Sequence, residues 1–384
     1  MDSNQEPTIF DSTALVNELI ARAEQTPAYN SKQTGMRRPM FRVVQLTQEA
    51  LKQWQKKGEA QRATRFSQDG ALFWALVDKT EENPQTSSDS GVVADPSVPL
   101  RLPSKLGEIE RGFSYQISSV YTLPEFRKRG LAGFFLTEVA KQLEQLPQAL
   151  ISVLYSDVGP TFYDKLGWKC HPSKLATLEI DHPRNTKAVD NNNSSTELKS
   201  LVLDDKLDKF LEADNARLVD ALANSEKFQG RNAFLILPTR DSIEWQFVNG
   251  VHYARAAGFD ELPSRCGVRI NDDAFVLWWH NLKESTLYVD RVRFPDSGDN
   301  AAEIIRVLLD AAMQEGRKLK LKKVVIWDPP SGLLRDDVRS LVEIEVAERK
   351  LSLSNAMVFR RGNVDDSKTT ALPHWFCNEK YAWV

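Results

Sequence analysis

Apolar residues recur along the chain with spacings that predict alternating strands and helices. Short β-rich runs predict strands at residues 41–45, 71–78, 113–122 and 150–155. Residues 47–61 and 131–146 place apolar side chains at helical spacing, and Pro147 ends the second of these runs. A short helix is expected between Pro160 and Gly167. Strands and helices that alternate at these lengths predict an α/β architecture.

The second half of the chain repeats this order. Residues 275–282 and 286–294 predict a hairpin, residues 301–315 an amphipathic helix ended by Gly316, and residues 323–328 a buried strand. The succession strand, strand, helix, strand therefore occurs twice. Such units recur often in α/β chains, so the repetition is either a true structural repeat or a coincidence.

Two segments interrupt the pattern. Residues 79–107, rich in Pro, Ser, Asp and Glu, are interpreted as a long surface insertion between two strands. Residues 181–198 contain a run of Asn and Ser and predict a linker. The predicted organisation is an N-terminal helical extension over residues 1–40, a first domain over 41–180, the linker, and a second domain over 199–384 with an aromatic tail.

The composition is that of a chain that folds, with 41% apolar and 27% charged residues. Its 50 Lys and Arg against 53 Asp and Glu give a net charge of -3, so we expect no nucleic-acid partner and no membrane binding. The 3 widely spaced cysteines predict neither a disulfide framework nor a zinc site. With no signal or transit pattern and no apolar run of ~20 residues, cytoplasm or nucleus is expected, and we take the cytoplasm.

The strongest candidate site is the turn that follows the strand at residues 113–122. Here the chain runs into a basic turn, and Gly130 opens the next helix. The first N–H groups of a helix lack intrahelical partners, the helix dipole is positive there, and glycine lets a phosphate approach the backbone. The turn lacks the patterns of a nucleotide P-loop and of a dinucleotide fold. Three cationic residues add positive charge, namely Arg127, Lys128 and Arg129.

These residues resemble the GNAT superfamily of acetyl-CoA-dependent N-acetyltransferases. Arg127, Gly130 and Ala132 match the family's pyrophosphate loop, Arg/Gln-x-x-Gly-x-Gly/Ala, and residues 162–168 are similar to its Leu/Phe-Tyr-x-x-Leu-Gly-Phe element. The alternative is a solvated basic turn followed by an ordinary helix cap. The resemblance implies a GNAT fold, with a central mixed sheet of splayed strands and flanking helices, followed by a second, degenerate GNAT-like α/β domain. It also implies acetyl-CoA as the acyl donor and no metal.

The resemblance assigns roles to individual residues. Tyr163 would be the general acid that protonates the leaving thiolate, the alternative being a core tyrosine. Asp157 stands near a position where relatives contact the cofactor. The strand end at Val120, Tyr121 and Thr122 would bind the pantetheine arm, and the pyrophosphate would lie on the turn formed by Arg127, Lys128, Arg129, Gly130, Leu131 and Ala132.

The family's usual general base is missing from its place. Several members carry a Glu on the strand before the loop, whereas this chain has Gln116, which cannot accept a proton. Glu108 and Glu110 lie upstream and would act through water, the alternative being plain surface residues.

The C-terminal residues offer another base. Residues 376–384 are rich in aromatic side chains, so we expect them to be packed, with Tyr381 and Trp383 as anchors. In some tandem GNAT enzymes the terminal carboxylate acts as the base, which makes Val384 a candidate here. The alternative is a tail that docks on the core and serves only stability.

A finer resemblance covers nearly the whole chain. Residues 117–132 and 275–281 are similar to the fungal acetyltransferases that N6-acetylate free L-lysine in lysine catabolism. In the second half, residues 295–300 form an acidic loop that would repel a cofactor phosphate, so this half is expected to shape the substrate site. The rival hypotheses are a protein lysine acetyltransferase and a non-catalytic acyl-CoA-binding protein.

A free amino acid needs a cation for its carboxylate and aromatic or acidic groups for an ammonium. Arg291 and His280 on the hairpin are candidates, although both are also consistent with surface positions. Trp278 and Trp279 point to opposite faces, so one lines the site at most, and Trp278 is our candidate.

Overall fold

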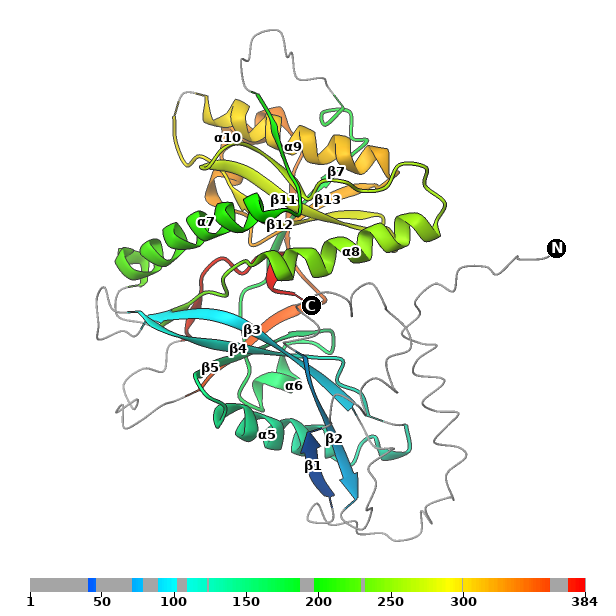
Figure 1. Ribbon diagram of the computed structural model, residues 1–384, viewed down its shortest axis with the longest axis vertical. Helices are drawn as coiled ribbons and strands as arrows, with labels where there is room; N and C mark the ends of the chain where they lie inside the picture. Colours follow the sequence, from blue (N-terminus) through cyan, green and yellow to red (C-terminus); the bar gives the residue numbers. More distant parts are fainter. Residues whose placement is uncertain are drawn as a thin grey trace, which may run out of the picture.

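The computed structural model describes residues 41–45, 71–78, 89–101, 109–122, 124–186, 197–228, 232–298, 300–359 and 372–383, with only the backbone described in the first three ranges. Two sheets lie one above the other and form two lobes (Figure 1). We call the lobe that contains β4 and β5 the first lobe and the lobe that contains β11 to β13 the second lobe. The C-terminal segment, drawn in red, lies between them (Figure 1).

The first lobe is built on a mixed sheet with the strand order β1-β2-β3-β4-β5-β15-β6, and β9 pairs with both β3 and β16. β4 and β5 are parallel, whereas β15 is antiparallel to β5. The predicted strands at 41–45 and 71–78 are confirmed as β1 and β2. The bounds are β1 Phe41–Gln45, β2 Ala71–Asp78, β3 Asp89–Arg101, β4 Glu110–Ser118, β5 Ala149–Ser156, β6 Lys169–Cys170, β9 Ala233–Phe234, β15 Leu353–Val358 and β16 His374–Trp375.

The segment at 79–107 was wrongly predicted to be a surface insertion. Its residues 89–101 form β3, which pairs with β2 on one side and with β4 on the other. Its prolines hid the strand from the sequence pattern, because proline has no N–H to donate to a ladder. The pairing with β4 shifts register between Asp95 and Val98, and Pro96 falls within this irregularity.

Helix α5 (Leu131–Glu144) confirms the predicted helix and buries its apolar face in the first lobe. The short helix α6 (Thr161–Asp164) follows β5, as predicted. Trp168, which is fully buried, donates its indole N–H to the Ser152 hydroxyl at 3.0 Å, and this hydroxyl donates to the Tyr115 carbonyl at 2.9 Å. Trp168 thereby fixes the end of the α6 turn against β5 and β4. The predicted helix at 47–61 and the extension at 1–40 lie outside the described residues.

The second lobe contains a sheet with the order β14-β7-β13-β12-β11-β10-β8. The predicted hairpin is confirmed as β11 and β12, and β13 runs parallel to β12. The pairing of β11 with β12 has a bulge, because Val289 and Arg291 face consecutive residues of β11 and Asp290 is skipped. The bounds are β7 Lys174–Glu179, β8 Lys199–Leu201, β10 Gly267–Asn271, β11 Ala274–Asn281, β12 Thr286–Arg293, β13 Lys323–Trp327 and β14 Glu345–Glu348.

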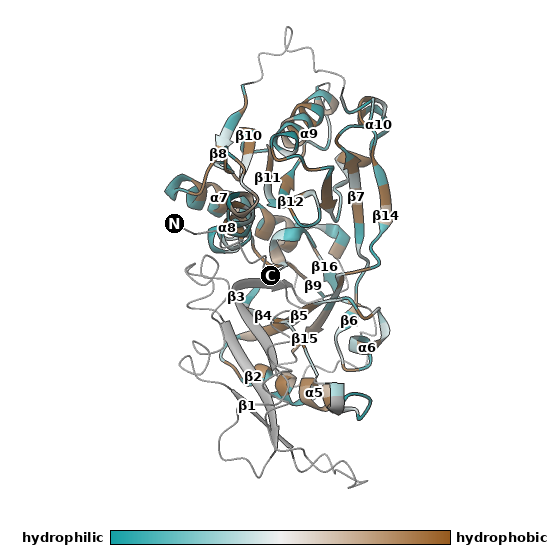
Figure 2. Ribbon diagram, turned by 90° about the vertical axis from the view of Figure 1, so that its right-hand side faces the viewer, coloured by the Kyte–Doolittle hydropathy of each residue, from teal (hydrophilic) through white to brown (hydrophobic). Residues whose placement is uncertain are grey.

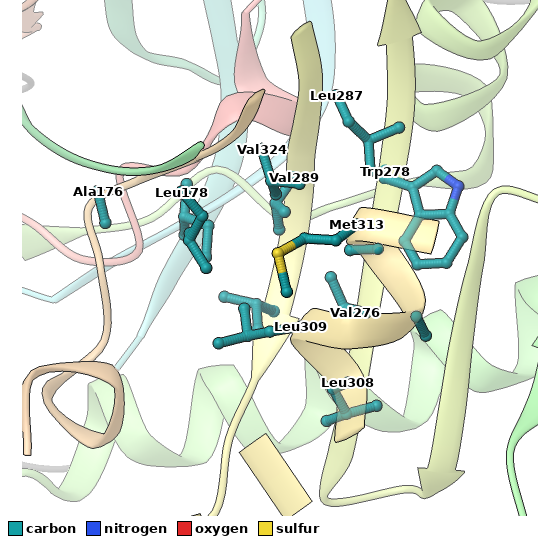
Figure 3. Packing of buried hydrophobic residues seen from close by; sticks show 14 of the residues in the cluster. Ala176, Leu178, Val276, Trp278, Leu287, Val289, Leu308, Leu309, Met313 and Val324 are labelled. Carbon is teal, nitrogen blue, oxygen red and sulfur yellow. The ribbon is translucent and has the colours of Figure 1, made fainter. Parts of the chain in front are cut away.

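Helices cover both faces of this second sheet. α9 (Ala301–Lys318) packs against one face, where Leu308, Leu309 and Met313 meet the strand residues drawn in Figure 3. α7 (Asp205–Asn224) and α8 (Arg240–Ala256) lie on the other face, toward the first lobe (Figures 1 and 2), and the short α10 (Asp336–Leu341) packs beside α9. Within the described ranges, no helix is apolar and long enough to span a bilayer.

The repeat predicted from the sequence is present in the topology. β3, β4, α5 and β5 correspond in order and pairing to β11, β12, α9 and β13, since each set has an antiparallel hairpin, a helix and a parallel strand. The sheets do not follow the predicted division at 181–198, however. β7 lies before that segment yet pairs with β13 and β14, and β15 lies after it yet pairs with β5. The second lobe thus takes β7 from the first half of the chain, and the first lobe takes β9, β15 and β16 from the second half.

Gly316 does not end α9 as predicted. The helix continues to Lys318, and a Cβ at Gly316 would lie 2.5 Å from the Cδ1 of Ile180. The glycine therefore allows a close approach of the helix to the chain after β7. Glycine is required here for packing and does not mark the end of the helix.

A buried arginine connects α7, β12 and the C-terminal segment. Arg291 is 3% exposed, and its Nε donates to Asp214 at 2.8 Å while its Nη1 donates to both carboxylate oxygens of Glu379 at 2.9 and 3.1 Å. Arg293 adds a second ion pair to Asp214 at 2.7 Å. Burial by itself raises the pKa of the Asp214 carboxyl, but Arg291 and Arg293 outweigh it and lower that pKa. We call these four residues the Arg291 clamp.

Replacing Arg291 with Met should destabilise the protein strongly, because Glu379 then stays buried without its cation. We expect a loss of about 3–5 kcal/mol in the free energy of unfolding, measured by urea denaturation. Arg184→Met is the matched control, since the Arg184–Glu343 pair is exposed (45% and 48%) and should cost about 1 kcal/mol or less. Equal losses in the two variants would contradict the clamp.

Candidate active site

The predicted cofactor loop begins where the central strands separate. β4 and β5 pair only as far as Ile117 and Leu154, although β5 continues to Ser156. Val120, Tyr121 and Thr122 follow β4 without belonging to a strand. The strand end therefore leaves the sheet at the position where the splayed strands of a GNAT fold were expected.

The turn after this strand end presents the start of α5. Gly130 is the N-cap residue and has a φ of 76, the left-handed region that favours glycine. The first helical bond runs from the Phe134 N–H to the Gly130 carbonyl at 3.1 Å, so the N–H groups of residues 131–133 have no partner within the helix. Lys128 is also left-handed, with a φ of 60. This geometry suits an anion, as the sequence predicted.

The basic side chains of the turn are exposed. Arg127 donates its Nε–H to the Thr122 carbonyl at 2.9 Å, and its guanidinium lies 5.5 Å from the centre of the Tyr121 ring. Arg127 thereby ties the turn back to the strand end and keeps its charge beside the helix start. The residues present fit the diphosphate of a CoA molecule, which needs backbone N–H donors and positive charge.

Tyr163 lies on α6, the first helix after β5. Its ring is partly buried with the core of the first lobe and contacts the Phe162 ring edge-on at 4.9 Å. Burial, and secondly the charge of Asp157, raise the pKa of the Tyr163 hydroxyl, so the hydroxyl keeps its proton at neutral pH. Asp157 is exposed, and its Oδ1 accepts a hydrogen bond from the Ser352 N–H at 2.8 Å. A contact of Asp157 with the cofactor remains a prediction.

A ring of aromatic side chains lies between the lobes and encloses a lysine. The Lys380 Nζ lies 3.3, 4.2, 4.7 and 5.9 Å from four ring centroids, those of Trp383, Trp327, Tyr288 and Trp279 in that order. We call these four rings the aromatic cage. They come from β11, β12, β13 and the C-terminal segment, and the Trp279 ring stacks on Tyr288 and Trp383. Burial lowers the pKa of Lys380 well below its ordinary value, although Asp290 opposes the shift.

The cage touches the first lobe through Trp327. The Tyr155 ring, near the end of β5, lies 5.7 Å from the Trp327 ring, and the Arg349 guanidinium lies 3.5 Å from it. The charge of Asp157 acts on both Lys380 and Tyr163. The aromatic cage and Tyr163 therefore flank the same end of β5.

The structure corrects the three substrate residues predicted on the hairpin. Trp278 is fully buried in the core between the second sheet and α9 (Figure 3), and its neighbour Trp279 faces the cage instead. His280 is fully buried and pairs with Glu315 at 3.3 Å. The hydrogen bonds of Arg291 go to the clamp and to the Val292 carbonyl, because its strand face is covered by α7 and the tail.

Of the residues considered as the general base, the structure describes only some. Val384 and Glu108 lie outside the described residues. Glu110 is exposed at the first residue of β4, and at ~3.3 Å per residue it lies roughly 25 Å from Ser118 at the other end. Because β4 and β5 are parallel, Glu110 is remote from Tyr163. Gln116 is buried in β4, 4% exposed.

The predicted packing of the tail is confirmed for residues 376–383. Tyr381 is fully buried and donates its hydroxyl to the Ile236 carbonyl at 2.6 Å. The Gln246 side chain donates to the carbonyls of Trp383 at 2.6 Å and of Lys380 at 3.1 Å. Tyr381 thus ties the tail to the segment before α8, and Trp383 is held on α8 through its carbonyl. Sequence reasoning missed Lys380, Arg349 and most of the cage, because no local spacing links these residues.

The family description "LYC1 GNAT-like C-terminal domain" matches residues 179–384, more than half of the chain. The protein is therefore of the GNAT-like class. More specifically, the chain belongs to the family defined by this LYC1 GNAT-like domain.

Individual relatives are more distant. A lysine acetyltransferase of Yarrowia lipolytica is 25% identical over 264 residues, and the match covers 60% of this chain and 66% of the relative, slightly under two thirds of its length. A GCN5-related N-acetyltransferase of Kribbella flavida shares 14% identity with a TM-score of 0.44, over 83% of this chain and 72% of that one. The N-myristoyltransferase of Saccharomyces cerevisiae shares 9% identity with a TM-score of 0.43, over 86% and 82%.

Substitutions in the turn should weaken acetyl-CoA binding. Gly130→Leu places a side chain where the phosphate would approach, and Arg127→Ala removes a charge-assisted bond, which should lower affinity roughly ten- to a hundredfold. Gly258→Leu is the matched control, because Gly258 has a φ of 74 and nothing within 4 Å of its Cβ position. It carries the same backbone strain away from the turn. Calorimetry with acetyl-CoA measures all three, and unchanged affinity in the first two would contradict the site.

Proposed function

We propose that this protein is an acetyl-CoA-dependent N-acetyltransferase that converts free L-lysine to N6-acetyl-L-lysine, a reaction of lysine catabolism. The observation that carries the proposal is that Tyr163 packs in the same apolar cluster as Val120, which follows β4, and Leu131, which follows the left-handed Gly130. Family membership and the name of the Yarrowia lipolytica relative support the reaction type.

The chain's own residues have distinct tasks in this reaction. Acetyl-CoA, when bound, supplies an activated thioester that an amine can attack directly. The N–H groups at the start of α5 and the basic turn hold the diphosphate and fix the register of the donor. The Tyr163 hydroxyl holds the proton that the leaving sulfur needs, and its raised pKa keeps that proton available.

A small amine as acceptor is supported by the position of the aromatic cage. The cage lies between the lobes, and its residues Trp279 and Trp327 are 3% and 4% exposed, as is Lys380 at 3%. A lysine within a folded protein would need a more open surface. The alternatives are a protein lysine acetyltransferase and a non-catalytic acyl-CoA-binding protein.

An amine panel tests the proposal and its alternatives. CoA release from acetyl-CoA is followed with L-lysine, other amino acids, polyamines and lysine-containing peptides, and mass spectrometry distinguishes N2- from N6-acetyllysine. Release with L-lysine and formation of the N6 product support the proposal. Release only with peptides would favour the protein acetyltransferase, and acetyl-CoA binding without any release would favour the non-catalytic alternative.

The acceptor amine must lose a proton. A lysine side chain with a pKa of ~10.4 is almost fully protonated at neutral pH, so a group at the site must accept or relay that proton. We propose the terminal carboxylate of Val384 for this role. Its support is the anchoring of the preceding residues, since the Trp383 ring belongs to the cage and the Trp383 carbonyl is held by Gln246.

Tyr163→Phe should separate chemistry from binding. The substitution keeps the ring and removes only the hydroxyl, so turnover should fall by ~10²-fold or more while acetyl-CoA affinity stays near wild type. Because the pKa of Tyr163 is raised above 10.0, the acid remains protonated below that pH, and loss of the acid should not reduce wild-type turnover between pH 7 and 10. Steady-state kinetics and calorimetry check both. A loss of affinity without a loss of turnover would make Tyr163 structural.

A short Gly-Ser extension after Val384 should test the terminal base. It displaces the carboxylate and leaves the anchors at Tyr381 and Trp383 in place. We expect turnover to fall by ~10²-fold or more and the pH dependence to change. Val384→Ala, which keeps a carboxylate at the same position, is the control and should remain active. An extended enzyme with wild-type turnover and pH dependence would show that the tail only docks.

A further inference from the structure

Two buried basic side chains, Arg349 and Lys380, lie against the same indole ring, that of Trp327 in the aromatic cage. The Arg349 guanidinium lies 3.5 Å and the Lys380 Nζ 4.2 Å from the centre of the Trp327 ring. Arg349 is 7% and Lys380 3% exposed. Arg349 uses its Nη2 to donate to the Ser354 hydroxyl at 2.7 Å, whereas its Nη1 has no hydrogen-bond partner. Within the described part of the chain, neither cation has a carboxylate at ion-pair distance.

Carboxylates act on this pair without forming ion pairs with it. The charges of Asp328 and Glu348 favour the charged form of Arg349, and those of Asp290, Glu284 and Asp157 favour the charged form of Lys380. Asp157 and Asp328 each accept a backbone N–H, from Ser352 at 2.8 Å and from Asn378 at 3.0 Å. Buried cations without a counterion are costly, and two that lie close together repel each other. Arg349 accordingly contributes to the lowered pKa of Lys380, after burial itself. An anion that contacts both groups would reduce these costs and would favour the charged form of Lys380.

Asp290 is an acidic group that interacts with Lys380. Burial raises the pKa of its carboxyl well above the ordinary value, and the charge of Lys380 opposes this shift. Asp290 is fully buried at the bulge of β12, and neither of its carboxylate oxygens has a hydrogen-bond partner. It is the acidic group that acts most strongly on Lys380, yet the two groups form no ion pair. Buried polar atoms are almost always partnered in folded proteins, so unpartnered ones at one place indicate a polar ligand. The Trp279 indole N–H, in the wall of the cage, is also without a partner.

We propose that Lys380 and Arg349 bind the α-carboxylate of a free amino acid and that Asp290 binds its α-ammonium group. The proposal rests on the proposed function and specifies its substrate class. A free amino acid carries both charges, whereas a lysine within a peptide has amides in their place. Guanidinium and ammonium groups are the ordinary protein partners of carboxylates, and the planar guanidinium pairs with both oxygens. The head group would thus be held on the second lobe, and the side chain would extend along the end of β5 toward Tyr163.

The variant that tests this inference is Lys380→Met, which keeps an unbranched stem and removes the charge. L-Lysine is compared with cadaverine, which has the same chain and terminal amine but no carboxylate. Wild type should have a kcat/KM at least tenfold higher for L-lysine, and Lys380→Met should lower it roughly ten- to a hundredfold for L-lysine with little change for cadaverine. The KM for acetyl-CoA should not change. Lys206→Met, at an exposed lysine on α7, is the matched control.

A binding experiment separates this inference from the reaction itself. L-Norleucine has the α head group and chain length of lysine but no side-chain amine, and its binding is followed by tryptophan fluorescence and calorimetry. Wild type should bind norleucine, 1-aminopentane should bind at least tenfold more weakly, and Asp290→Asn and Lys380→Met should each weaken norleucine binding. Norleucine binding without turnover of L-lysine would uphold the head-group site and overturn the proposed reaction.

Two results would overturn the head-group site. One is wild-type protein with the same kcat/KM for L-lysine, L-lysinamide and cadaverine. This measurement needs no variant, so its result stands even if a variant fails to fold. The other is a folded Lys380→Met protein, with unchanged acetyl-CoA affinity, that discriminates L-lysine from cadaverine as well as wild type does.

Discussion

Arg291 is the residue at which a helix, a strand and the C-terminal segment are joined, and the position of the aromatic cage depends on it. Its guanidinium is buried and donates to Asp214, Glu379 and the Val292 carbonyl. A buried ion pair repays the loss of hydration only when its hydrogen bonds are complete, and here both carboxylates are paired. Because Glu379 directly precedes Lys380, the clamp fixes the backbone that carries Lys380 into the cage.

The two lobes depend on each other for their sheets as well as for the site. β7 and β15 each pair in the lobe formed mainly by the other half of the chain. A single apolar cluster contains Leu150 and Ile151 of β5, Leu277 of β11, and Tyr381 of the tail. Burial of this shared surface opposes separation of the lobes. A site built at their junction is therefore held by packing on both sides.

The two lobes contribute different chemistry to the candidate site. The first lobe carries the left-handed turn at Gly130 and the protonated hydroxyl of Tyr163. The second lobe and the tail carry the rings and charged groups around Lys380. The second lobe repeats the strand and helix order of the first, but its acidic loop at 295–300 stands where the first lobe has basic residues. This division agrees with a donor site on one repeat and an acceptor site between the two.

Short-range features of the chain were predicted well because their physical causes are local. The spacing of apolar residues predicted α5, β5, the hairpin and β13, and glycine at a helix start predicted the turn at Gly130. β3 was missed, because its prolines and acidic residues contradict a strand pattern and only pairing on both sides stabilises it. The exchange of β7 and β15 was missed too, because nothing local shows which sheet a strand joins.

The sequence alone determined the repeated α/β order, the anion-binding turn, the tyrosine on α6 and the packing of an aromatic tail, since each follows from residues close together in the chain. The tertiary structure decided which charges meet. Arg291 bonds to Asp214, 77 residues away in the sequence, and to Glu379, 88 residues away. These long-range bonds show that Arg291, predicted to bind substrate, belongs to the Arg291 clamp. The same long-range packing brought Lys380 and Arg349 together at the Trp327 ring. Burial and charge pairing act through space, so only the folded chain shows which cations are already neutralised and which remain for a ligand.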